Sequence, residues 1–118
     1  MKKMLQATLM SLCLLSTGYV WAHAHPKSEV PGEGSIVISV SDITITFDDA
    51  LEPALSTLSV SDAQGKLVTN TKAELDTATH KTLHVNVPSL VSGVYLVKWV
   101  AVSLDGHRTS GAYHFTVK

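Results

Sequence analysis

Two histidines follow an uncharged, mostly apolar stretch near the start of the chain, in the segment Val20-Trp21-Ala22-His23-Ala24-His25-Pro26. If the chain is cut after Ala22 or after Ala24, the new first residue is a histidine. Its free α-amine is then joined to the Nδ1 atom of its own imidazole by only a few bonds, so the two nitrogens can chelate one metal ion. Amine and imidazole nitrogens suit Cu(II) in tetragonal geometry, and Cu(II) stands highest in the Irving–Williams order. The segment therefore predicts a Cu(II)-binding N-terminus.

A carboxylate and an imidazole lie close together near the other end of the chain, in Ser103-Leu104-Asp105-Gly106-His107. Asp105 and His107 are two positions apart, so in an extended segment both point to the same side. Gly106 between them permits a tight or irregular backbone. On its own, such a pair is more typical of a hairpin turn with a solvated histidine. Together with a terminal histidine, it predicts the second half of a metal site.

The first 22 residues have the pattern of a secretory signal peptide. Met1-Lys2-Lys3 is a basic start, and no charge follows until His23. A transmembrane helix needs about 20 apolar residues, and nothing basic follows this stretch to stop transfer. We therefore expect residues 1–22 to be removed, residues 23–118 to form one periplasmic domain, and no stable membrane insertion.

Two cleavage sites obey the small-x-small rule. Cutting after Ala22 is favoured, because Val20-Trp21-Ala22 ends the apolar run directly. The chain would then begin His23-Ala24-His25, and the amine, the intervening amides and His25 could wrap one Cu(II). Cutting after Ala24 would instead leave His25-Pro26, and proline has no amide hydrogen to lose, so only the amine and Nδ1 of His25 could chelate.

Removal of the leader changes the composition. All three methionines and the single cysteine, Cys13, lie within the first 22 residues. Disulfides are then excluded, and so are the soft sulfur ligands that select Cu(I), which predicts a Cu(II)-only protein.

Lys+Arg falls from 9 to 7 against 10 Asp+Glu, and this acidic balance argues against nucleic-acid binding. So short a chain can hardly enclose the deep cleft of a large enzyme.

The elements that must position these residues are strands. Apolar and polar residues alternate over 43–47, 58–60, 83–87 and 113–117. The run 94–102 is apolar at almost every position, which predicts a central strand covered on both sides, with Lys98 as the exception. Turn signals separate the strands at 31–34, 63–66, 92–93 and 105–107. The pattern predicts an all-β single domain, a small antiparallel Greek-key β-barrel or sandwich of immunoglobulin-like type.

The order of these motifs resembles the CopC family of periplasmic copper-binding proteins, including its YobA-type members. The resemblance rests on His25-Pro26-Lys27, on Val102-Ser103-x-Asp105-Gly106-His107 and on Gly111-x-x-x-Phe115-x-Val117. It implies a Greek-key β-barrel and one Cu(II) per chain, bound by the N-terminal amine and imidazole, Asp105 and His107. Some family members carry a further carboxylate after the phenylalanine of the second strand, which makes Asp49 an additional candidate.

The function expected is that of a Cu(II) carrier or buffer in copper homeostasis or resistance, without catalysis. Its predicted metal ligands are His23, His25, Asp105 and His107, and an inner-membrane copper transport protein is a candidate partner. One alternative is a histidine-brace copper oxidase or monooxygenase, although the domain is small and only 6% of the residues in the whole chain are aromatic. The other is an immunoglobulin-like structural module with incidental histidines.

We expect His80, His84 and His114 to be solvated, and Tyr95 and Trp99 to lie in the core.

Overall fold

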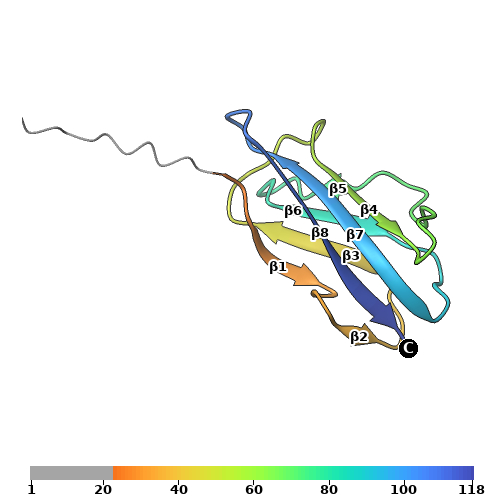
Figure 1. Cartoon of the computed structure of the whole chain (residues 1–118). Coiled ribbons are helices and arrows are strands. Elements are labelled where there is room, and N and C mark those ends of the chain that lie inside the picture. Colours follow the sequence, from red (N-terminus) through yellow and green to blue (C-terminus); the bar gives the residue numbers. More distant parts are fainter. Residues whose placement is uncertain (1–22) are drawn as a thin grey trace, which may run out of the picture.

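The computed structural model describes residues 23–118, so the predicted signal peptide lies outside the described residues. Strands and turns, with no helix, make up this part of the chain, and the strands form two four-stranded sheets (Figure 1). One sheet has the order β1 (Pro26–Val30), β3 (Asp42–Phe47), β6 (Thr82–Asn86) and β5 (Glu74–Leu75). The other has the order β2 (Ile36–Val37), β8 (Arg108–Val117), β7 (Gly93–Val102) and β4 (Thr57–Ser61). The predicted all-β class is confirmed.

Residues 23–118 therefore contain no helix that could span a membrane.

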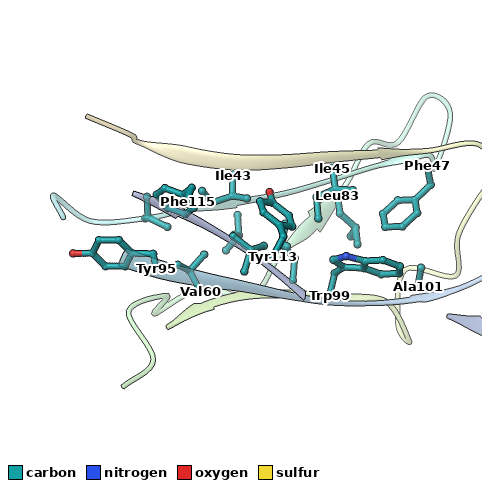
Figure 2. Packing of buried hydrophobic residues seen from close by; sticks show 14 of the residues in the cluster. Ile43, Ile45, Phe47, Val60, Leu83, Tyr95, Trp99, Ala101, Tyr113 and Phe115 are labelled. Carbon is teal, nitrogen blue, oxygen red and sulfur yellow. The ribbon is translucent and has the colours of Figure 1, made fainter. Parts of the chain in front are cut away.

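The core lies between the two sheets, where every second side chain of the long strands points inward (Figure 2). Tyr95 of β7 stacks on Phe115 of β8 with their ring centroids 5.6 Å apart. Phe47 of β3 meets Trp99 of β7 edge to face at 5.2 Å, which joins the two sheets. The prediction that Tyr95 and Trp99 are core residues is confirmed.

Strand β7 differs from its prediction, because only one of its faces is covered. Val94 and Lys98 point outward and are exposed, while Tyr95 and Val97 between them are buried. The expectation of a strand covered on both sides was therefore wrong. In a two-layer sandwich each sheet keeps one face toward solvent, and the outward β-branched residues of β7 reflect the preference of strands for such side chains.

The two predicted halves of the metal site lie at the same end of the molecule. β7 and β8 form a long antiparallel hairpin, and its turn holds residues 103–107. Gly106 in this turn has φ of 90°, a conformation that glycine adopts without strain. β1 pairs antiparallel with β3, with Pro26 opposite Phe47, so the start of β1 lies near the turn between β7 and β8, and the C-terminus lies at the opposite end (Figure 1).

Candidate metal centre

The segment before β1 is part of the folded domain. Ala24 is fully buried and belongs to the core cluster. The Thr109 hydroxyl at the start of β8 donates a hydrogen bond of 2.8 Å to the Ala24 carbonyl oxygen. The His25 amide donates to the Asp48 carboxylate at 2.8 Å, and the Asp48 amide donates back to the His25 carbonyl oxygen at 3.0 Å. The backbone of residues 24 and 25 is thereby fixed to both sheets.

This anchoring brings the N-terminal histidines to the turn between β7 and β8. The His23 ring lies 5.4 Å from the His107 ring, centroid to centroid and nearly perpendicular to it. The His25 ring lies 6.2 Å from the His23 ring. Three of the four predicted ligands are imidazoles, and the His23 ring is near both of the other two.

Asp105 is held in place by the turn that carries it. Its Oδ2 atom lies 2.8 Å from Nδ1 of His107, and its Oδ1 atom accepts hydrogen bonds from the Ser103 hydroxyl and from the His107 amide. The Ser103 hydroxyl, followed by the side chain and amide of His107, lowers the pKa of Asp105 to about 2. The carboxylate is therefore ionised at any pH at which the protein would work.

The arrangement supplies nitrogen and carboxylate ligands, but they meet in pairs. Within residues 23–118, no group of three or more histidine or acidic side chains is already gathered closely enough to hold a metal ion. His107 contacts Asp105 on one side and His23 on the other. A carboxylate at one imidazole nitrogen fixes the ring and directs its second nitrogen toward a metal. The described side chains thus form two contacting pairs that share His107.

Two adjacent carboxylates after β3 differ in what they contact. Asp49, the candidate from the sequence, accepts a hydrogen bond from the Ala50 amide at 2.9 Å. Asp48, which sequence reasoning missed, is the one that contacts the histidine segment. The pairing of Pro26 with Phe47 places residues 25 and 48 next to each other, and a correct prediction of that register would have found the contact.

The remaining histidines lie outside this group. His84 of β6 lies on the solvent side of its sheet, with Nε2 3.6 Å from Glu74 of β5. His114 of β8 is exposed. His80 has a φ of 56°, and its carbonyl oxygen accepts a hydrogen bond from the Leu51 amide.

Comparison with known proteins gives one family match and several relatives. The model of the CopC domain matches residues 26–118. Protein YobA of Escherichia coli K12 is 34% identical over 106 residues, covering 88% of this chain and 86% of YobA. The copper transport protein CutJ of Bacillus subtilis is 31% identical over 99 residues, covering 82% of this chain but only 18% of CutJ.

Solved structures agree with these relatives. The crystal structure of CopC from Methylosinus trichosporium OB3b is 32% identical with a TM-score of 0.75, covering 81% of this chain and 94% of that one. The crystal structure of PcoC, a methionine-rich copper resistance protein from Escherichia coli, is 29% identical with a TM-score of 0.69, covering 82% and 100%. The domain match spans most of the sequence and the same two-sheet fold recurs in these structures, so the chain belongs to the CopC family.

Proposed function

We propose that the chain is an exported Cu(II)-binding protein that carries or buffers copper in the periplasm, in copper homeostasis or resistance, and that catalyses no reaction. The observation that carries the proposal is the contact of the His23 ring with the His107 ring, which is itself held by Asp105. The names of two relatives, a copper transport protein and a copper resistance protein, support the choice of metal.

The proposed ligands of one Cu(II) are the amine and imidazole of His23, the imidazole of His107 and the carboxylate of Asp105. The His25 imidazole, 6.2 Å from that of His23, supplies a further nitrogen. A wrapped complex that uses the His25 amide is disfavoured, because this amide donates to Asp48 and would have to give up that hydrogen bond. Asp49 is left out of the set of ligands, because its carboxylate accepts a hydrogen bond from the Ala50 amide.

The contacts of Ala24 support cleavage after Ala22. Cleavage after Ala24 would remove a fully buried methyl group together with the carbonyl that Thr109 binds. The new amine at His25 would lie against the Asp48 carboxylate, 2.8 Å from the nitrogen, and would pair with it. A start at His23 keeps these contacts and leaves the amine beside the turn that holds His107.

The oxidation state follows from the available ligands. Residues 23–118 contain no methionine and no cysteine, so sulfur, which favours Cu(I), is absent from the proposed site. The ionised Asp105 further favours the more highly charged Cu(II). These features also weigh against the alternative of a copper oxidase or monooxygenase, which must cycle through Cu(I). Reductant-driven oxygen consumption by the copper-loaded protein would support that alternative.

The test is a Cu(II) competition titration of the exported protein, made with its own leader, with the intact mass measured with and without copper. We expect a first residue of His23 and one Cu(II) per chain. His107→Ala should weaken Cu(II) binding by orders of magnitude. The matched control is His84→Ala, which removes another imidazole that lies beside a carboxylate, that of Glu74, and should leave binding nearly unchanged. Equal effects of the two substitutions would remove His107 from the site.

A further inference from the structure

The inward row of β8 runs from the core into the proposed site. Phe115 and Tyr113 are buried, and His107, in the turn directly before β8, continues the alternation beyond Gly111 and Thr109. Thr109 is therefore the last side chain between the core and the proposed copper ligand. Its hydroxyl lies 2.8 Å from the Ala24 carbonyl oxygen and 3.5 Å from that of Ala101. Because a hydroxyl has a single proton, the shorter contact identifies Ala24 as the main acceptor.

Hydrogen bonds to the Ala24 carbonyl oxygen and to the His25 amide fix the orientation of the backbone just after His23. The methyl group of Ala24 is fully buried, and the next amide, that of His25, is bound by Asp48. His23 precedes this fixed peptide and lies against His107. The carbonyl and methyl groups of Ala24 and the amide of His25 are thus all held in place. Only rotation about its own backbone and side-chain bonds can then move the His23 imidazole.

We propose that Thr109 is a positioning residue for the copper site, which holds the Ala24 carbonyl so that His23 faces His107 before the metal arrives. The proposal rests on the proposed function, in which His23 and His107 bind the same Cu(II). Without the hydrogen bond, the first residues would sample other positions and would have to be ordered when copper binds, which weakens affinity.

The substitutions that test this differ by single groups. Thr109→Val keeps the β-branched shape and removes only the donor. Thr109→Ser keeps the hydroxyl and removes only a methyl group. Thr116→Val makes the same change at the opposite end of β8, opposite Val94, and serves as the control. Thr109→Ala replaces Thr109→Val if the latter does not fold.

The measurement is the Cu(II) affinity of each exported protein by competition titration, after its intact mass has confirmed that it begins at His23. Loss of one neutral hydrogen bond predicts binding about three- to tenfold weaker for Thr109→Val. We expect Thr109→Ser and Thr116→Val to stay within about twofold of the original affinity, on the same scale. The electron paramagnetic resonance spectrum at saturating Cu(II) should not change, because every ligand is retained.

A double-mutant cycle separates positioning from a general loss of stability. If Thr109 acts through His23, Thr109→Val should have a smaller effect on Cu(II) affinity in a His23→Ala protein, which keeps the terminal amine but lacks the imidazole. An unchanged affinity of Thr109→Val, a failure of serine to restore binding, or the same loss in the His23→Ala background would each overturn the positioning role. If the original protein bound no Cu(II), the proposed function would fall as well, so the two failures are distinguishable.

Discussion

The two buried tyrosines of the core differ in whether their hydroxyls are satisfied. The Tyr95 hydroxyl donates a hydrogen bond of 2.6 Å to the Val91 carbonyl oxygen. The Tyr113 hydroxyl is buried and has no hydrogen-bond partner within residues 23–118. Burial, and in second place the charge of Glu29, raises the pKa of Tyr113 well above its usual value. The neutral phenol is therefore strongly preferred in the folded state.

We predict that Tyr113→Phe is tolerated at pH 7 and protects the fold at high pH. A group with a raised folded-state pKa contributes stability that is present below its unfolded pKa, about 10 for tyrosine, and is lost as the pH rises toward the folded value. The original protein should therefore lose stability above about pH 10, and Tyr113→Phe should lose less. Urea unfolding at pH 7 and at about pH 10.5 measures both effects.

Tyr95→Phe is the matched control, because it removes a satisfied hydroxyl from the same core. It should cost about 1 kcal/mol at pH 7, whereas Tyr113→Phe should cost nothing or stabilise the protein slightly. A larger loss from Tyr113→Phe than from Tyr95→Phe would show that the Tyr113 hydroxyl has a partner in solution.

At the scale of elements, the hairpin of β7 and β8 depends on a close approach between Trp99 and Gly111, which face each other in its register. A Cβ atom at Gly111 would lie only 2.5 Å from the Trp99 ring. Trp99 therefore lies over a position without a side chain, and its other side contacts Phe47 of the opposite sheet. Both rings belong to the hydrophobic core between the two sheets.

We predict that Gly111→Ala displaces Trp99 and destabilises the domain by about 1–3 kcal/mol, the usual range for overpacking. Trp21 lies in the predicted leader, so Trp99 is the only tryptophan of residues 23–118. Its fluorescence during urea unfolding reports both the shift of the ring and the loss of stability. Ala112→Ser, which changes the neighbouring exposed position, should change neither, and an unaltered spectrum in Gly111→Ala would contradict the prediction.

The sequence predicted the long strands well and the contacts between them poorly. Alternation located β3, β6 and β8, because each buries one face. The two-residue strands β2 and β5 leave no periodic signal, and the apolar run of β7 concealed its exposed face. Asp105 and His107 were predicted because they are neighbours in one turn. Asp48 and Thr109 were missed, since their contacts with the histidine segment depend on which strands pair and in which register.

At the scale of the whole molecule, the proposed site joins the beginning of the described chain to the turn between its last two strands. Ala24 and Thr109 are separated by 85 positions in the sequence. A metal ion held by His23 and His107 would close this long loop in the folded state only. Copper binding and global stability should therefore be coupled.

We predict that Cu(II) raises the unfolding temperature of the exported protein. At a free Cu(II) concentration of about 100 times the Kd, native-state binding adds up to about 2.7 kcal/mol. The control is the same domain with one extra residue before His23, which moves the amine away from its imidazole and should lose most of the increase. Equal increases in both proteins, measured by differential scanning calorimetry, would show that the amine is not a ligand.

The inward row of β8 has a consequence for misfolded forms of the protein. His107 directly precedes β8 and continues the alternation by which Phe115, Tyr113 and Gly111 face the core. A pairing of β7 and β8 shifted by one residue would turn this whole row outward, and Arg108 would take the place of His107. Such a species would keep its strand content, and circular dichroism would hardly distinguish it from the native protein. The number of Cu(II) ions bound per chain would therefore equal the fraction of molecules in which β7 and β8 are correctly paired. Copper titration would then measure how much of a preparation is correctly folded.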